Sequence, residues 1–311
     1  MVTGCNGLLG QKVSELLARG TSHKLILASR NDKPLVSIPD ASHIRLDITK
    51  KRDVRNAVAE WEPNVILNAA AMTNVDACEK ERELAWKINV GGVENIIEAV
   101  KRIDATVLHV STDYVFDGKA GPYTEEDRPE PLSYYGRSKL ASENALRVSG
   151  LKYVVARTMV LYGYAPGIKS NFALWLIQNL EKQTPVHVVN DQMGNPTLAD
   201  DLAHALVSAI ELGRTGIYHI AGREIVSRYE FAVKLARIFG FDQDLITPIT
   251  TSQLKQPAAR PLNSGLVTLK AEVELGYRPS TMEEGLTILK GQISHSSRRM
   301  PDSAPVPGRK A

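Results

Sequence analysis

Tyr135 and Lys139 are four residues apart in a segment of helical pattern, so their side chains share one face of the expected helix. An ammonium group beside a phenol stabilises the phenolate, so we expect the pKa of Tyr135 to fall from about 10 towards neutrality. Such a tyrosine can give a proton to a carbonyl oxygen or take one from an alcohol. A lone Y-x-x-x-K pair also occurs by chance on surface helices, so the rest of the chain decides.

Thr112 lies just past the apolar run 106–110, which we expect to be a buried strand. Open α/β sheets place their chemistry at the carboxyl ends of their strands. The Thr112 hydroxyl could therefore hold the same oxygen that Tyr135 protonates. Asp113 and Tyr114 follow directly and are candidate substrate contacts.

Three glycines follow the short first strand, Val2–Thr3, with the spacing G-x-x-G-x-x-G, and a helix of apolar periodicity starts within them. Glycines allow a tight turn and let backbone N–H groups approach a pyrophosphate at the helix N-terminus. The pattern alone is weak evidence, but the buried-strand run 24–29 that follows makes it strong. The expected dinucleotide contacts at this turn are Gly4, Asn6, Gly7, Leu8, Leu9 and Gly10.

Ser29 and Arg30 end the second expected strand, where dinucleotide sites contact the adenosine ribose. A carboxylate at this place suits NAD, whereas a cation suits the 2′-phosphate of NADP. We therefore expect NADP, with NAD possible if Asp32 supplies the acid instead. Arg30 could equally be a solvated loop residue.

Further cofactor contacts are expected at the ends of the third and fourth strands. Asp47, next to Ile48, could accept from the adenine amino group or could cap the following helix. Asn89 lies early in an apolar-periodic helix, 86–100, and could hydrogen-bond the active-site strand and fix its bend. The small residues that end the fourth strand would let a cofactor lie close: Asn68, Ala69 and Ala70.

The alternation of strands and helices, βαβαβαβα, predicts an α/β fold with a doubly wound parallel Rossmann sheet of about seven strands. Residues 1–160 would form the NADP-binding domain, completed by segments near 198–221. Residues 161–197 and 222–290 would form a smaller, mixed substrate-binding part, with the short strand 186–189 outside the main sheet. The Ser-, Arg- and Pro-rich residues 291–311 are expected to be a disordered tail.

Two polar segments of the smaller part are candidates for substrate binding. Gln192 and Asn195 lie in the turn-rich loop 191–197, which could face a substrate or serve as a structural connector. Arg260 lies in an extended segment, 260–264, between two expected helices.

The bulk composition excludes several classes of protein. The chain has 311 residues, 43% of them hydrophobic, and a formal net charge of only +3, so no electrostatic case exists for nucleic acid or membrane partners. Cys5 and Cys78 have no metal-ligand spacing and are expected to be reduced thiols of a cytoplasmic protein without a metal site. No apolar run has the roughly 20 residues of a membrane span. The first strand is unusually short, so residues upstream of Met1 could be missing.

The chain resembles the extended short-chain dehydrogenase/reductase superfamily, and within it the dTDP-4-dehydrorhamnose reductase family, over nearly the whole length to about residue 290. The glycine turn and Y-x-x-x-K are typical of the superfamily, and the other markers are narrower. The markers are 3–10, Ser111–Gly118 (STDYVFDG), Tyr135–Lys139 (YGRSK), Arg157–Thr158, 191–197 (DQMGNPT) and Arg260–Ser264 (RPLNS).

The resemblance implies an oxidoreductase of carbohydrate biosynthesis with Thr112, Tyr135 and Lys139 as the catalytic triad. Tyr135 would protonate a keto oxygen while NADPH delivers hydride to its carbon. Lys139 would bind the nicotinamide ribose and lower the Tyr135 pKa, and Thr112 would orient the carbonyl. The substrate would be a keto-sugar linked to a nucleoside diphosphate, and a homodimer is possible.

One position departs from the family pattern. The family often has a tryptophan beside the sugar, in the segment after Arg157–Thr158, and here Val160 takes that place. Two alternatives stay open on the same scaffold. One is a non-catalytic NADP-binding regulator similar to the regulatory subunit of methionine adenosyltransferase. The other is a nucleotide-sugar epimerase or dehydratase.

Overall fold

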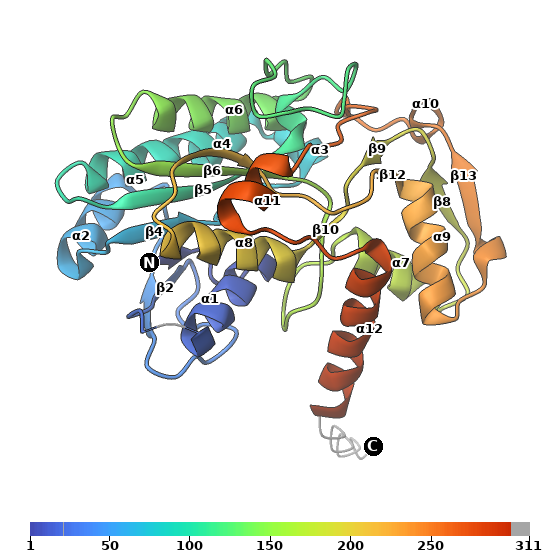
Figure 1. The fold of residues 1–311 in the computed structure, drawn as a ribbon, viewed down its shortest axis with the longest axis horizontal. Coiled ribbons are helices and arrows are strands. Elements are labelled where there is room, and N and C mark those ends of the chain that lie inside the picture. The colour runs from blue at the N-terminus through green and yellow to red at the C-terminus, as the bar shows by residue number, and fades with distance from the viewer. Residues whose placement is uncertain (21, 300–311) are drawn as a thin grey trace, which may run out of the picture.

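A seven-stranded sheet forms the centre of the molecule in the computed structural model, which describes the chain except residue 21 and residues 300–311 (Figure 1). Every pair of neighbouring strands is parallel. The strands, in spatial order, are β11 (Gly216–His219), β6 (Tyr153–Thr158), β5 (Thr106–Thr112), β4 (Val65–Asn68), β1 (Val2–Thr3), β2 (Ile26–Ser29) and β3 (Ser42–Arg45). The chain order reverses between β1 and β4, which is where doubly wound sheets bind their ligands. The predicted fold class is confirmed.

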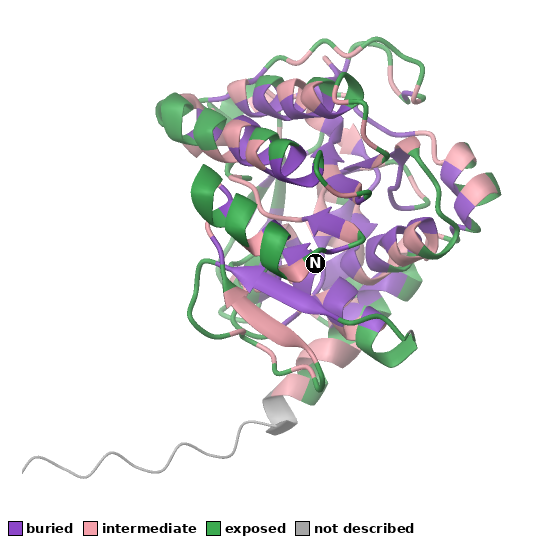
Figure 2. Ribbon diagram, turned by 90° about the vertical axis from the view of Figure 1, so that its left-hand side faces the viewer, coloured by how far each residue is buried: buried purple, intermediate pink, exposed green. Residues whose placement is uncertain are grey.

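Helices cover both faces of this sheet, because its central strands are apolar on both sides. One layer contains α1 (Leu8–Gly20), α8 (Ala199–Glu211) and α11 (Leu269–Leu275). The other contains α2 (Lys51–Trp61), α5 (Gly92–Val100) and α6 (Tyr134–Arg147). Figure 2 shows the strands as the most buried layer, with the exposed residues on the outer faces of the helices.

The crossover from β2 to β3 differs from the expected alternation. Residues 30–41 connect these strands as bends and turns without a helix. This segment is rich in Asp, Pro and Ser, which favour turns over helices.

The helix predicted over 86–100 is interrupted near its start. The chain passes from α3 (Val75–Lys80) to α4 (Arg82–Trp86), then through one π-helical turn, Lys87–Gly91, into α5. A π-turn holds one extra residue per turn and is frequent at functional sites. Here it includes Asn89.

A smaller part with its own apolar core follows β6 in the chain. Its helices are α7 (Phe172–Leu180), α9 (Arg228–Phe239), α10 (Thr251–Leu254) and α12 (Met282–Arg299). Its strands are β7 (Leu161–Tyr162), β8 (Val186–Val189), β9 (Met193–Gly194), β10 (Thr197–Leu198), β12 (Val226–Ser227) and β13 (Ile246–Ile249). As predicted, β8 lies outside the main sheet, where it pairs with β13.

Single 3₁₀ turns span Asp113–Val115, after β5 of the main sheet, and Gln243–Leu245, before β13 of the smaller part.

The predicted disordered tail begins too early. α12 continues to Arg299, and residues 300–311 lie outside the described part of the chain. Gln292 donates to Asp200 Oδ1 at 3.1 Å and accepts from the Tyr164 N–H at 3.2 Å, and Tyr164 Oη lies 2.7 Å from Ser296 Oγ. These contacts keep a polar sequence helical. None of the helices in the described structure is long and apolar enough to cross a membrane.

Candidate active site

Thr112 ends β5, in register with Thr158 of β6. Its hydroxyl accepts from the Tyr114 N–H at 3.2 Å and so begins the 3₁₀ turn Asp113–Val115. The same hydroxyl donates to Asp113 Oδ1 at 3.0 Å. The chain therefore turns sharply at the carboxyl edge of the sheet and holds three polar side chains there.

Helix α6 brings Tyr135 to this edge. Ser133 caps the helix by accepting from the Gly136 N–H at 3.1 Å. A Cβ on Gly136 would overlap the Tyr114 carbonyl oxygen, so only glycine lets the first turn of α6 sit this close to the turn after β5. The Tyr114 and Tyr135 rings meet edge to face, with centroids 5.7 Å apart.

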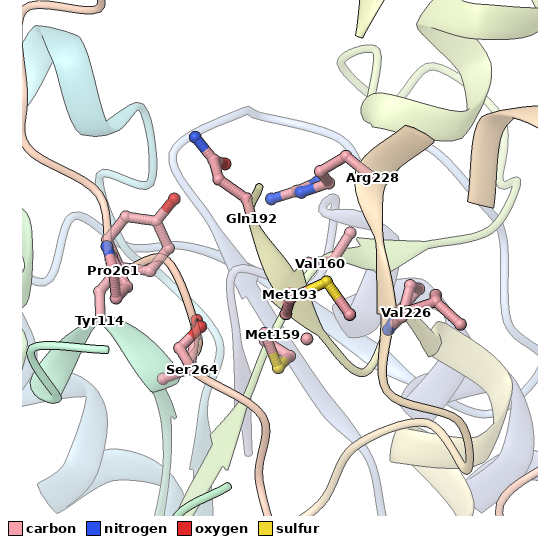
Figure 3. Close-up of a pocket in the computed structure, with 12 residues that line it drawn as sticks. Tyr114, Met159, Val160, Gln192, Met193, Val226, Arg228, Pro261 and Ser264 are labelled. Atoms are coloured by element: carbon pink, nitrogen blue, oxygen red, sulfur yellow. Dashed lines mark hydrogen bonds between the residues drawn. The ribbon is translucent and has the colours of Figure 1, made fainter. Parts of the chain in front are cut away.

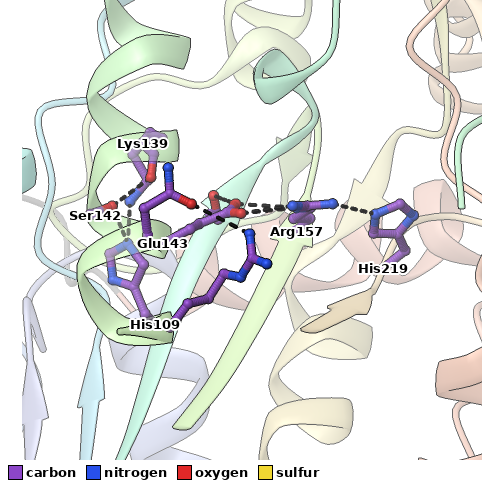
Figure 4. Close-up of polar contacts among 9 residues, drawn as sticks. His109, Lys139, Ser142, Glu143, Arg157 and His219 are labelled. Carbon is purple, nitrogen blue, oxygen red and sulfur yellow. Dashed lines mark hydrogen bonds and ion pairs between the residues drawn. The ribbon is translucent and has the colours of Figure 1, made fainter. Parts of the chain in front are cut away.

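The predicted lowering of the Tyr135 pKa is wrong for this structure. Burial of the hydroxyl raises the pKa of Tyr135, and a hydrogen bond with Thr112 only partly opposes that effect. The reason lies in where Lys139 points. It shares the helix face with Tyr135, but its Nζ lies 3.0 Å from Nε2 of His109 on β5 (Figure 4). Burial also lowers the pKa of Lys139 to about 8.

His109 carries its proton on Nε2, as its partners show. Asn68 Oδ1 accepts from Thr3 Oγ1 at 2.6 Å and from the Ala70 N–H at 3.3 Å, so the Asn68 amide must turn its NH₂ group to His109 Nδ1, 3.2 Å away. An Nδ1 that accepts leaves the proton of a neutral imidazole on Nε2. That N–H has an acceptor in Ser142, whose hydroxyl lies 3.0 Å from Nε2 and gives its own proton to the Lys139 carbonyl at 2.7 Å.

A buried ion pair lies beside this network. Arg157 Nη2 is 2.8 Å from Glu143 Oε2, and both side chains are at most 2% exposed. Ser111 donates to the same carboxylate, and Arg157 Nη1 lies 3.4 Å from His219 Nε2 (Figure 4). The group ties α6 to β5, β6 and β11 and so fixes the helix that carries Tyr135.

The glycine turn forms the cofactor side of the edge. Gly4 has a φ of +71°, and a Cβ there would lie 2.8 Å from the Ala70 nitrogen. A Cβ on Gly10 would overlap the Gly4 carbonyl oxygen, and the Gly7 N–H bonds to that same oxygen at 2.9 Å. The N–H groups of Leu8 and Leu9 find no acceptor within the described residues and point out from the helix N-terminus. These residues fit a dinucleotide pyrophosphate.

Two of the predicted cofactor contacts have other partners. Asn6 donates to Ser29 Oγ at 3.1 Å and accepts from the Leu35 N–H at 2.8 Å, so it fixes the loop after β2. The Ser29 hydroxyl also lies 3.2 Å from His43 Nε2. Ser29 is thus occupied within the loop, although we expected it to donate to the cofactor.

Arg30 is exposed at the end of β2 and makes no ion pair within the described residues. The competing acid, Asp32, is paired with Arg45 at 3.0 Å. The free guanidinium therefore lies where the 2′-phosphate is expected, and the carboxylate is already engaged.

The other residues predicted to contact the cofactor, Asp47, Ile48 and Asn89, make contacts within the protein. Asp47 accepts from the N–H and the hydroxyl of Thr49, at 3.0 and 2.9 Å, in the turn before α2, and Lys50 is the N-cap. Ile48 packs its side chain against Gly92. Asn89 bonds the Met72 backbone in both directions, with its Oδ1 2.8 Å from the Met72 nitrogen, instead of bonding β5 as predicted.

A pocket opens on the other side of Thr112, between the turn after β5 and the smaller part of the chain (Figure 3). Asp113 and Tyr114 line it, and so does Gln192 of the loop after β8. Burial raises the pKa of Asp113 to about 6 although its carboxylate accepts from Ser264 Oγ at 2.6 Å. The other lining residues are Met159, Val160, Met193, Gly194, Pro196, Val226, Arg228, Pro261 and Ser264.

Three of the predicted substrate contacts have partners within the protein, and one of them is Gln192, whose amide donates to Thr251 Oγ1 at 3.0 Å. Asn195 donates to the Gly222 carbonyl at 2.9 Å and accepts from the Leu266 N–H at 2.8 Å, so it joins two backbone segments inside the protein. Arg260 forms a two-pronged ion pair with Asp76, with both N···O distances 2.8 Å. It bridges α3 and the segment after α10.

The sequence reasoning missed Arg228, which lines the pocket and points into it (Figure 3). Its position could have been read from the capping box at 227–230, in which Ser227 and Glu230 start α9. Its direction depends on tertiary packing and could not.

Val160, at the position where the family often has tryptophan, has a φ of +43°. A β-branched residue rarely adopts positive φ, and such strain concentrates at functional sites. The backbone is held there by a bond from the Thr197 N–H to the Val160 carbonyl at 3.2 Å. No group of three or more potential metal-ligating side chains occurs in the described part of the chain.

The fold and the Thr112, Tyr135, Lys139 arrangement define an extended short-chain dehydrogenase/reductase. A family model, the RmlD substrate binding domain, matches residues 1–292. The chain belongs to this RmlD family, that of the dTDP-4-dehydrorhamnose reductases.

Individual relatives agree along nearly the whole chain. A dTDP-4-dehydrorhamnose reductase of Aggregatibacter actinomycetemcomitans is 34% identical over 303 residues, which cover 92% of this chain and 96% of the relative. The crystal structure of a dTDP-4-dehydrorhamnose reductase ortholog of Clostridium acetobutylicum superposes with a TM-score of 0.85 at 35% identity, covering 94% of this chain and 98% of the other. A dTDP-4-dehydrorhamnose reductase of Bacillus anthracis, solved in complex with NADP, gives a TM-score of 0.81 at 30% identity with the same coverage.

Proposed function

We propose that this protein is an NADPH-dependent reductase of the keto group of a nucleotide-linked sugar, similar to dTDP-4-dehydrorhamnose reductase. The observation that carries the proposal is the position of Tyr135 and Thr112 directly beside Tyr114 and Asp113, two residues that line the pocket. A carbonyl in the pocket would reach both hydroxyls. The relatives named for this activity, one of them solved with NADP, support it.

Each residue has a distinct role in this reaction. Thr112 would turn its hydroxyl proton from Asp113 Oδ1 to the carbonyl oxygen when the substrate binds, and Tyr135 donates the proton that turns that oxygen into a hydroxyl. The raised pKa of Tyr135 keeps the phenol protonated until then. When bound, NADPH supplies the hydride. Proton donation leaves Tyr135 as a phenolate. Protonated Lys139 would stabilise this anion after its Nζ turns from His109 towards the Tyr135 oxygen.

The cofactor preference and the cellular setting belong to the same proposal. The unpaired guanidinium of Arg30 favours NADPH. The two cysteines are unpaired and buried, which suits the reducing cytoplasm. We keep the homodimer as a hypothesis that light scattering tests.

The test is turnover of a panel of nucleotide-linked keto-sugars, followed by loss of nicotinamide absorbance. Tyr135→Phe should lower turnover about 10²–10⁴-fold, because the general acid is lost, and should leave the Kd for NADPH nearly unchanged. Tyr134→Phe is the matched control, since its ring faces Trp86 and Arg82, away from the site. Undiminished turnover in Tyr135→Phe contradicts the assignment.

The same panel separates the alternatives. A regulatory protein would reduce none of the sugars and would instead retain a protein partner. An epimerase or a dehydratase would purify with nicotinamide bound, visible in its absorbance spectrum, and would consume no NADPH overall.

A further inference from the structure

Arg228 is the first residue of α9, and the helix start fixes its direction. Ser227 caps the helix by accepting from the Glu230 N–H at 3.1 Å, and Glu230 returns a bond to the Ser227 N–H at 2.7 Å. The Arg228 N–H bonds to the Gln192 carbonyl at 3.2 Å, which ties α9 to the loop on the far side of the pocket. The side chain therefore leaves a rigid backbone.

The guanidinium of Arg228 has an aromatic support but no ion-pair partner among the described residues. Its Cζ lies 5.0 Å from the centre of the Phe172 ring, which holds the side chain by a cation–π contact. No carboxylate of the described residues lies within ion-pair distance of it, because Glu230 is used in the capping box. Asp113, in the same pocket, is bonded to Thr112 and Ser264. Burial raises the pKa of Asp113, and the charge of Arg228 partly opposes this effect without forming an ion pair.

Arg260 differs from Arg228 in having an ion-pair partner. It also borders the pocket region, but both of its terminal nitrogens are bonded to Asp76. Of these two arginines, only Arg228 offers an uncommitted guanidinium to a ligand. A half-buried guanidinium gains most from an anion that accepts two parallel hydrogen bonds, as phosphate oxygens do.

We infer that Arg228 binds a phosphate oxygen of the diphosphate in the nucleotide-linked substrate. This inference rests on the proposed function and names the residue that holds the charged end of the substrate. Asp113 and Tyr114, next to the reacting carbonyl, lie in the same pocket, so Arg228 anchors the substrate while the sugar reaches Tyr135. Remote binding of this kind positions the reacting carbon.

The test is calorimetric titration of the whole protein with thymidine diphosphate, uridine diphosphate and the two free nucleosides. Arg228→Met keeps the length and the apolar contact with Phe172 but removes the charge. We expect it to weaken binding of the diphosphates about 10- to 100-fold, the range for a charge-assisted hydrogen bond, without changing the affinity for the nucleosides. Arg228→Lys should restore part of the lost affinity. Arg223→Met, at an exposed arginine outside this pocket, should behave as the parent.

Melting temperatures of the variants show whether they fold. A diphosphate Kd within twofold of the parent in Arg228→Met overturns the inference, and so does a parent that binds neither diphosphate. Equal weakening of nucleosides and diphosphates also overturns it, because the effect would then be one of general pocket shape. Absence of keto-sugar reduction by the parent, with diphosphate binding that depends on Arg228, defeats the proposed reaction but supports the phosphate contact.

Discussion

At the scale of single residues, Asp113 shows burial and hydrogen bonding acting against each other. Its carboxyl accepts from Thr112 and Ser264, yet loss of solvent dominates and raises its pKa from 3.8 to about 6. A carboxyl with a raised pKa stabilises the fold only while it is protonated. That contribution is fully present below about pH 4 and is lost as the pH rises through about 6.

We therefore expect the free energy of unfolding of Asp113→Asn, minus that of the parent, to be larger at pH 8 than at pH 4. A shift of this size corresponds to about 2–3 kcal/mol in the difference between the two pH values. Urea unfolding of both proteins at both pH values measures it. Glu126→Gln, at an exposed carboxylate, is the control and should show no such difference. A pH-independent effect of Asp113→Asn would mean that the buried carboxyl is not the cause.

Arg30 sets the cofactor preference in a second prediction at this scale. Its guanidinium is exposed and unpaired among the described residues, whereas Asp32 is held by Arg45. NADPH should bind about ten- to a hundredfold more tightly than NADH, as expected for one charge-assisted contact. Arg30→Ala should weaken NADPH selectively, and added salt should reduce the difference. A parent that prefers NADH, or an equal loss for both cofactors, would make Arg30 an ordinary loop residue.

At the scale of the elements, the sequence predicted the strands, helix starts and turns that depend on neighbouring residues alone. The central strands are continuous apolar runs, as the run before Thr112 shows, and the capping residues Ser133 and Ser227 start their helices. The spacing of the glycines predicted the turn, and the structure gives the physical reason: a side chain on Gly4 or Gly10 would overlap nearby backbone atoms.

Contacts between distant residues could not be predicted in this way. Asn89 shares one apolar periodicity with its neighbours, and its contacts in the π-turn are with Met72, 17 residues away, and with Ser138 of α6. The loop 191–197 looked uniform, yet Gln192 lines the pocket and Asn195 binds backbone inside the protein. Lys139 was expected to face Tyr135, and a histidine on the adjacent strand changes its direction.

The start of α6 gives a prediction at this scale. In Gly136→Ala the added methyl would overlap the Tyr114 carbonyl, so the helix must move away from the turn after β5. We expect a loss of about 1–3 kcal/mol in the free energy of unfolding, typical of overpacking, and lower turnover with a nearly unchanged Kd for NADPH. Gly291→Ala, in α12 with open space around it, is the matched control and should be neutral or stabilising. Wild-type turnover in Gly136→Ala would show that the helix start tolerates movement.

At the scale of the whole molecule, polar links join the apolar core of the smaller part to the sheet and its helices. Arg260 and Asp76 connect the segment after α10 to α3, and the last turns of α12 contact Tyr164 and Asp200. The helix therefore belongs to the folded unit well past residue 290.

Shortening the chain tests this conclusion. A protein ending at residue 290 loses the bonds of Gln292 and Ser296, and we expect it to be less stable by about 2–4 kcal/mol, the sum of a few hydrogen bonds and some apolar area. A protein ending at residue 299 keeps every contact made by the described residues and serves as the control. Denaturant unfolding compares the three chains. If the proteins ending at residues 290 and 299 were equally stable, the part of α12 beyond residue 290 would not contribute to the stability of the fold.

The close approach at Gly136 also sets limits on how this scaffold can be re-engineered. Tyr135 and the turn after Thr112 are held together by a gap smaller than one methyl group, so a mutant library that varies position 136 should consist mostly of proteins in which these residues are displaced. Asn195 is equally unsuitable, since both ends of its amide hold backbone. Val160 and Met193 line the pocket without any side-chain hydrogen bond to lose. A search for new substrates can be confined to such positions, where size and polarity can change while the catalytic geometry stays fixed.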